Sequence, residues 1–150
     1  MAFKYYWEDL TVGETVDIGS YTITADEIIA FARQFDPQPF HTDAEKAKDS
    51  IYGGLIASGW HTAGLMMRLY AEHYLTKVGS LASPGVDELR WIKPVRPGDT
   101  LSVRVTILDA VASRSKPDRG VVTSFIEVLN QAEEVVMSMR AVNMILRRTV

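Results

Sequence analysis

Five stretches of the chain alternate apolar and polar residues or are rich in β-branched residues, which is typical of β-strands. The first covers residues 15–23, where Gly19 and Ser20 break the pattern. The other four follow one another in the second half of the chain, at residues 86–92, 100–111, 121–129 and 135–146. Clusters of turn-forming residues separate these four stretches. We therefore expect consecutive strands in an antiparallel sheet.

Helical periodicity fills the interval between the first strand and the other four. Thr24 followed by Glu27 fits a capping box, in which a hydroxyl and a carboxylate bind free backbone amides. Apolar residues then recur at helical spacing, and this helix must stop before Pro37. A second capping box, formed by Thr42 and Glu45, predicts a short helix that reaches about residue 48.

The longest predicted helix runs from Gly59 to about residue 77. Its first three turns are apolar on nearly every side, broken chiefly by His61, Thr62 and Arg68. A helix of this kind is usually buried, so other elements must surround it. The order of elements therefore predicts an α+β hot-dog fold, in which a curved antiparallel sheet wraps around a long central helix.

Composition and charge indicate one ordinary globular domain over residues 1–150, with 47% hydrophobic and 23% charged residues. Cysteine is absent, which excludes disulfides and thiolate chemistry. We see no secretory signal and no stretch of the ~20 apolar residues that a membrane span needs, so we expect a cytoplasmic protein without a membrane partner. A net charge of -3, with scattered basic residues, argues against binding to nucleic acid.

Residues 36–41, DPQPFH, carry the candidate chemistry. Asp36 and His41 are two acid/base groups on a segment that two prolines stiffen, and we expect this segment to be extended up to His41. A carboxylate and an imidazole that share one water can activate it for attack on the β-carbon of an unsaturated thioester and deliver a proton to the α-carbon. Since both groups approach from one face, we expect syn addition.

The start of the long helix offers a third group. Backbone amides lack internal partners there, the helix dipole favours negative charge, and glycine allows a close approach to the backbone. We therefore expect the Gly59 amide, next to Ser58, to bind the thioester oxygen as an oxyanion donor.

These segments resemble the MaoC-like (R)-specific enoyl-CoA hydratase and acyl dehydratase family. Residues 36–41 match its D-x-N-P-x-H signature, with Gln38 in place of the usual asparagine. Residues 55–59, LIASG, resemble the beginning of the family's central helix, with Ser58 where many members carry histidine. Residues 94–101, PVRPGDTL, resemble its later strand and turn, so the resemblance covers most of the chain.

The resemblance implies that Asp36 and His41 activate water and that Gly59 binds the thioester carbonyl. Further substrate contacts are expected from Gln38, Pro39, Phe40, Ser58 and Trp60. The implied reaction interconverts 2-enoyl and (R)-3-hydroxyacyl thioesters of CoA or an acyl carrier, as in fatty acid metabolism. No metal or redox cofactor is expected, and coenzyme A enters only as part of the substrate. The family also implies homodimers in which one subunit completes the pocket of the other.

Other interpretations of the same residues stay open. The scaffold also suits a thioesterase, in which Asp36 acts beside the carbonyl carbon, or a non-catalytic acyl-thioester-binding subunit. Asp36 alone fits a helix-terminating residue, and His41 alone fits a loop histidine. We expect His61 to pack or hydrogen-bond near the pocket rather than to catalyse, and His73 to lie on a solvated turn. The basic residues of one exposed loop could meet substrate phosphates, although solvated charge is the simpler interpretation; they are Arg114, Lys116 and Arg119.

Overall fold

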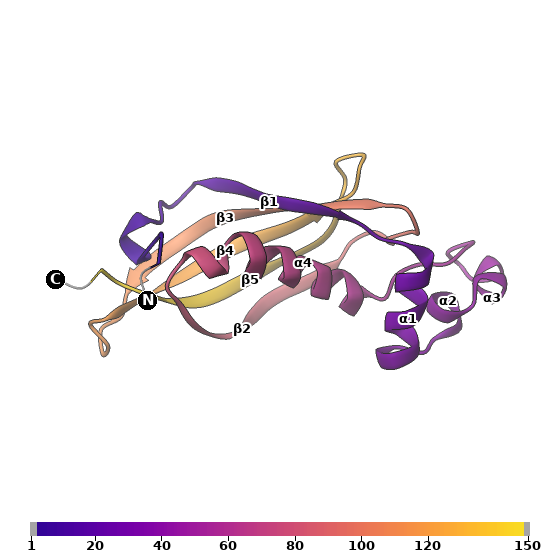
Figure 1. Ribbon diagram of the computed structural model, residues 1–150, viewed down its shortest axis with the longest axis horizontal. Coiled ribbons are helices and arrows are strands. Elements are labelled where there is room, and N and C mark those ends of the chain that lie inside the picture. The colour runs from indigo at the N-terminus through magenta and orange to yellow at the C-terminus, as the bar shows by residue number, and fades with distance from the viewer. Residues whose placement is uncertain (1–2, 149–150) are drawn as a thin grey trace.

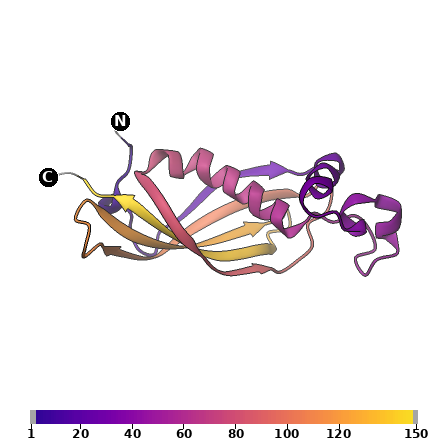
Figure 2. The same ribbon diagram turned by 90° about the horizontal axis from the view of Figure 1, so that it is seen from below.

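The structure, a computed structural model, describes residues 3–148. One antiparallel sheet of five strands lies against helix α4 (Gly59–His73), which runs along one face of the sheet (Figures 1 and 2). The strands are β1 (Thr15–Thr22), β2 (Ser80–Trp91), β3 (Thr100–Ala112), β4 (Arg119–Leu129) and β5 (Val135–Leu146). The predicted α+β architecture, a curved antiparallel sheet around a long helix, is confirmed.

The strand order is β1-β3-β4-β5-β2, so only part of the predicted succession of neighbouring strands is correct. Strands β3, β4 and β5 pair in sequence, as expected. Strand β2 instead pairs with β5 at the far edge, and residues 92–99 carry the chain back toward β3. It also begins at Ser80 rather than residue 86, because an edge strand tolerates the bulge that its register shows before Gly85.

The core lies between α4 and the sheet. Strands β3 and β4 bury alternate residues over most of their length, as a sheet with one covered face should. Helix α4 contributes Leu65, Met66, Leu69 and Tyr70. Its other side is open, because Trp60 and Met67 are 59% and 45% exposed. The expectation that other elements surround this helix is therefore correct for only one of its sides.

Helix α4 is shorter than predicted. It ends at His73, and a separate 3-10 turn, η2 (Leu75–Lys77), follows it. A second 3-10 turn, η1 (Trp7–Asp9), precedes the sheet. No helix in the described part of the chain has both the length and the apolar character needed to cross a bilayer.

Helix α1 (Ala25–Phe35) begins at the predicted capping box. The Thr24 hydroxyl accepts a hydrogen bond from the Glu27 amide, and the Glu27 carboxylate accepts one from the Thr24 amide, both at 3.2 Å. The helix ends at Phe35, and Asp36 is its C-cap residue directly before Pro37, as the proline predicts. Asp36 therefore lies at the C-terminal end of a well-anchored helix.

The two short helices that follow differ from the prediction. Residues 39–42 form a helical turn, α2 (Pro39–Thr42), rather than an extended segment, because proline at the first helical position costs no hydrogen bond. Helix α3 (Ala44–Lys48) is capped by Asp43 and not by Thr42. One carboxylate oxygen of Asp43 accepts from two backbone amides at its start. Helices α1, α2 and α3 gather at one end of the sheet (Figure 1).

Candidate active site

A cavity of about 390 Å³ lies where α2, the start of α4 and the end of β2 meet. Four residues predicted from the sequence line it: Gln38, Phe40, His41 and Gly59. Its other lining residues are mainly apolar and were not predicted: Tyr52, Ile56, Ala57, Thr62, Trp91, Ile92, Lys93, Pro94, Val95 and Val136. Ile56, Ala57, Pro94 and Val95 belong to the segments 55–59 and 94–101 that resemble the family, although no substrate contact was expected from them. The others come from segments far apart in the sequence, and no local pattern identifies them as lining residues.

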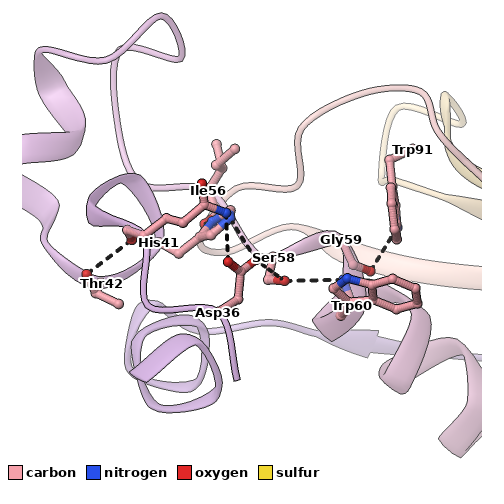
Figure 3. Close-up of polar contacts among 9 residues, drawn as sticks. Asp36, His41, Thr42, Ile56, Ser58, Gly59, Trp60 and Trp91 are labelled. Carbon is pink, nitrogen blue, oxygen red and sulfur yellow. Dashed lines mark hydrogen bonds and ion pairs between the residues drawn. The ribbon is translucent and has the colours of Figure 1, made fainter. Parts of the chain in front are cut away.

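The structure brings Asp36 and His41 together. Nε2 of His41 lies 3.3 Å from Oδ2 of Asp36 (Figure 3). The imidazole is almost fully buried, with 6% of its side chain exposed, whereas 18% of the Asp36 side chain reaches solvent. Asp36 stands at the end of α1 and His41 lies within the α2 turn, so the bend between the two helices creates the pair.

The hydrogen bonds of the His41 ring fix which nitrogen exchanges a proton. Nδ1 lies 2.7 Å from the backbone oxygen of Ile56. Because a carbonyl oxygen only accepts, Nδ1 must carry a hydrogen and donate it. Nε2, which faces Asp36, is therefore the nitrogen that gains or loses a proton at this site. The backbone amide of Ile56 also donates to the Phe40 carbonyl at 3.1 Å. Two hydrogen bonds therefore connect Ile56 to the α2 turn that carries His41.

Both oxygens of the Asp36 carboxylate accept hydrogen bonds from neutral donors. Nε2 of Gln38 donates to Oδ1, and Oγ of Ser58 donates to Oδ2, each at 2.7 Å. Burial raises the pKa of Asp36, but the hydrogen bonds from Gln38 and Ser58, together with the nearby His41, outweigh it and hold this pKa below its usual value. The carboxylate is therefore kept ionised beside the imidazole.

Ser58, which is completely buried, begins helix α4. Its hydroxyl accepts a hydrogen bond from the Trp60 amide at 3.3 Å while donating to Asp36. Within residues 3–148, the Gly59 amide makes no hydrogen bond to a backbone or side-chain acceptor. An unpaired amide at a helix N-terminus attracts negative charge, and Gly59 lines the cavity beside His41. The site thus combines an acid/base pair with a candidate oxyanion donor.

The carbonyl of Gly59 is held by a residue that sequence reasoning missed. Nε1 of Trp91, the last residue of β2, donates to this oxygen at 2.9 Å (Figure 3). The rings of Trp60 and Trp91 also meet edge to face, with centroids 5.0 Å apart. Trp91 lies 32 positions after Gly59, and nothing local in either segment signals the contact.

Four predicted site residues are not among those that line the cavity: Asp36, Pro39, Ser58 and Trp60. Asp36 and Ser58 lie behind its lining residue His41, in contact with one another. Pro39 borders a separate surface hollow behind α2, and Trp60 is 59% exposed beside Trp91. His61 is buried and stacks on Phe31 of α1, with ring centroids 4.7 Å apart, so it packs next to the site. His73 ends α4 with about half of its side chain exposed.

The basic loop between β3 and β4 lies at the end of the sheet opposite α1, α2 and α3 (Figure 1). Arg114 and Lys116 belong to this loop, and the guanidinium of Arg119 is paired with the carboxylate of Asp118. Within this chain, these charges are therefore remote from Asp36 and His41.

Comparison with known proteins identifies the family. Residues 9–144 match the family described as the MaoC like domain. The crystal structure of a MaoC-like dehydratase from Rhodospirillum rubrum superposes with a TM-score of 0.91 at 44% identity, covering 97% of this chain and 99% of that one. Bacillus subtilis YdeM, an uncharacterized protein, is 32% identical over 126 residues, which are 84% of this chain and 88% of YdeM. The (R)-specific enoyl-CoA hydratase of Rhodospirillum rubrum is 28% identical over 115 residues, covering 73% and 74%.

The fold and these relatives define a hot-dog domain of the hydratase and dehydratase class. The chain belongs to the MaoC-like dehydratase family. The resemblance inferred from residues 36–41, 55–59 and 94–101 is thereby confirmed.

Proposed function

We propose that the protein interconverts 2-enoyl and (R)-3-hydroxyacyl thioesters of CoA by adding or removing water. The observation that carries the proposal is the 3.3 Å pair of His41 Nε2 and Asp36 Oδ2, beside a cavity that His41 and Gly59 line. Membership of the family supports the reaction class. The relative described as an (R)-specific enoyl-CoA hydratase supports the substrate class and the stereochemistry.

Hydration places one water molecule against the Asp36–His41 pair. The water oxygen forms a bond to C3 of the enoyl group as one water proton passes to the pair. The electrons of the C2–C3 double bond move toward C1, and the thioester oxygen gains negative charge. The Gly59 amide donates a hydrogen bond to that oxygen, which lowers the barrier because the charge develops only during the reaction.

The second half of hydration returns the proton. As the thioester carbonyl re-forms, C2 takes a proton from the Asp36–His41 pair, which restores the starting state of both side chains. Dehydration runs the same steps in reverse. Because one pair on one side of the substrate handles both protons, hydrogen and hydroxyl add to the same face, which is syn addition.

A homodimer is part of the proposal. Strand β2 lies at the edge of the sheet and exposes apolar side chains along its length, among them Leu81, Val86 and Trp91. An edge strand with unpaired backbone groups is a template for pairing with another chain, and a second copy of this strand is the matching partner. Because β2 ends at the cavity, such a partner would also border the site.

The function is tested by incubating the purified protein with crotonyl-CoA and longer 2-enoyl-CoAs in D₂O. NMR of the product identifies both new stereocentres, and a thiol reagent measures free CoA in the same reaction. We expect (R)-3-hydroxyacyl-CoA with deuterium added syn at C2, and no release of thiol. Hydrolysis of saturated acyl-CoA would instead support a thioesterase. Binding of acyl-CoA without turnover would support a non-catalytic acyl binder, and either result would refute the proposal.

A further inference from the structure

The side chain of Trp91 meets Gly59 at two points. Its Nε1 donates to the Gly59 carbonyl at 2.9 Å (Figure 3). Its ring also covers the α-carbon so closely that a β-carbon at position 59 would lie 2.4 Å from Cε2 of the indole, far inside van der Waals contact. Glycine at this position therefore leaves the space that the indole fills. The same ring lines the cavity.

These contacts hold one peptide unit from both sides. The Gly59 carbonyl and the Trp60 amide belong to the same peptide, and the Trp60 amide donates to Ser58 Oγ at 3.3 Å. The first turn of a helix has unpaired amides and depends on outside contacts for its geometry. Trp91 on one side and Ser58 on the other therefore define how this turn is oriented. The adjoining Gly59 amide takes its direction from the same turn.

We propose that Trp91 is a positioning residue that holds the first turn of α4, so that the Gly59 amide faces the thioester oxygen, and that its ring forms the wall of the substrate pocket beside that amide. The inference rests on the proposed function, because it assigns the Gly59 amide to the thioester. It adds a second role for β2, since the edge strand now ends in a side chain that shapes the site.

Two substitutions separate the hydrogen bond from the ring contact. Trp91→Phe keeps an aromatic ring but removes the N–H donor, and kcat with crotonyl-CoA should fall by roughly 3- to 10-fold. Trp91→Ala removes both contacts, and kcat should fall by about 100-fold because the amide is no longer aligned. KM should change less than kcat in both variants, because an oxyanion donor acts mainly in the transition state. A kcat of Trp91→Ala within about twofold of the wild type would overturn the inference.

The chain offers a matched control at the other end of the sheet. Trp7 lies over Gly120 as Trp91 lies over Gly59, because a β-carbon at position 120 would also come within 2.4 Å of the indole. Nε1 of Trp7, however, has no hydrogen-bond partner among the described residues. Trp7→Phe should therefore leave kcat unchanged. An equal loss of kcat in Trp7→Phe and Trp91→Phe would show a general effect of the substitution and refute the positioning role.

A double-mutant cycle tests the contact itself. The three heavy atoms nearest to a β-carbon at position 59 all belong to Trp91, so Gly59→Ala should displace the indole and lower kcat as Trp91→Ala does. In the Trp91→Ala background the added methyl group has room, and Gly59→Ala should then cost little. Losses that multiply in the double variant would mean that the two residues act independently, which contradicts the inference.

A binding measurement distinguishes this inference from the proposed function. Calorimetry with butyryl-CoA, which lacks the double bond, reports docking of the thioester without turnover. If Trp91→Ala binds butyryl-CoA more weakly and Trp7→Phe does not, the result supports the role of Trp91 as a wall of the substrate pocket. That support holds even if the wild type hydrates no enoyl-CoA, because a lack of hydration refutes only the proposed function. If the wild type hydrates crotonyl-CoA while Trp91→Ala matches it in both kcat and butyryl-CoA affinity, the function stands and the role of Trp91 is refuted.

Discussion

Ser58 Oγ donates a 2.7 Å hydrogen bond to Asp36 Oδ2. Ser58 Oγ also accepts a hydrogen bond from the backbone amide of Trp60, the residue after Gly59. One hydroxyl thus caps helix α4 and holds the carboxylate at the end of helix α1. Since His41 lies 3.3 Å from the same carboxylate oxygen, the position of the acid/base pair is tied to the start of the helix that carries Gly59. Three of the proposed catalytic groups therefore share one rigid connection.

Ser58→Ala should raise the pKa of Asp36, because it removes one of the two neutral donors that lower this pKa against the effect of burial. A higher pKa moves the acid limb of the kcat/KM profile toward higher pH. Loss of the cap should also lower the free energy of unfolding by about 1 kcal/mol. A pH–rate profile and urea denaturation measure the two effects separately.

Thr24→Ala is the matched control for this substitution. Thr24 caps α1 through the same kind of bond but donates nothing to Asp36. It should lose a similar unfolding free energy and keep the acid limb in place. An acid limb that is equally unmoved in Ser58→Ala would contradict the link between Ser58 and the carboxylate.

Gln38→Glu places a second carboxylate where Nε2 of Gln38 now donates to Asp36 at 2.7 Å. Repulsion between like charges should raise the pKa of Asp36 and shift the acid limb upward. Activity near neutral pH should fall, though by less than the ~100-fold expected for complete loss of a general base. Gln131→Glu, in the β4–β5 turn, breaks the same type of bond, to Asp99 directly before β3, and should leave the pH–rate profile unchanged.

The sequence predicted those features that local chemistry determines. The Thr24 capping box, the stop before Pro37 and the strands from β3 to β5 each follow from neighbouring residues. The helical turn of α2 was missed because Pro39 permits both an extended and a helical continuation. The position of β2 beside β5 was also missed, since it depends on pairings such as Trp91 with Met137 that no local pattern encodes.

The same distinction applies to the site. Asp36 and His41 were found because they share one six-residue segment with two prolines. The donor role of Ser58 and the contact between Trp91 and Gly59 depend on side chains that meet only after folding, 22 and 32 positions apart. Residue type alone gave no signal for either contact.

Folding stability should decrease as pH falls below about 6.5 because of His61. Burial lowers the pKa of His61 below its usual value, although the charge of Glu27 raises it in part. At a pH between the pKa values of His61 in the folded and unfolded states, the unfolded state binds more protons. The free energy of unfolding is therefore unaffected by His61 above the unfolded pKa, and it decreases as the pH falls from that value toward the folded pKa. Urea denaturation from pH 7.5 to 5 checks this, and His61→Gln should show a flatter dependence than the wild type.

Val86→Lys should weaken the proposed homodimer. Val86 is 49% exposed on the edge strand β2, where a lysine opposes pairing with a second copy. Val111→Lys introduces the same charge at a similarly exposed position of β3, which pairs there with Val121 of β4 and lies away from the β2 edge, and should not affect assembly. Light scattering after gel filtration gives the mass of each variant. A wild type that stays monomeric, or equal masses for all three proteins, would refute this interface.

The most direct test of the Asp36–His41 pair compares kcat/KM for crotonyl-CoA hydration in the wild type, Asp36→Asn and His41→Ala, with unfolding curves to verify that each variant folds. We predict that each single substitution lowers kcat/KM by about 100- to 10,000-fold and that the double variant is little worse than either one, because the two groups act as a unit. Folded variants that retain the turnover of the wild type would contradict the account.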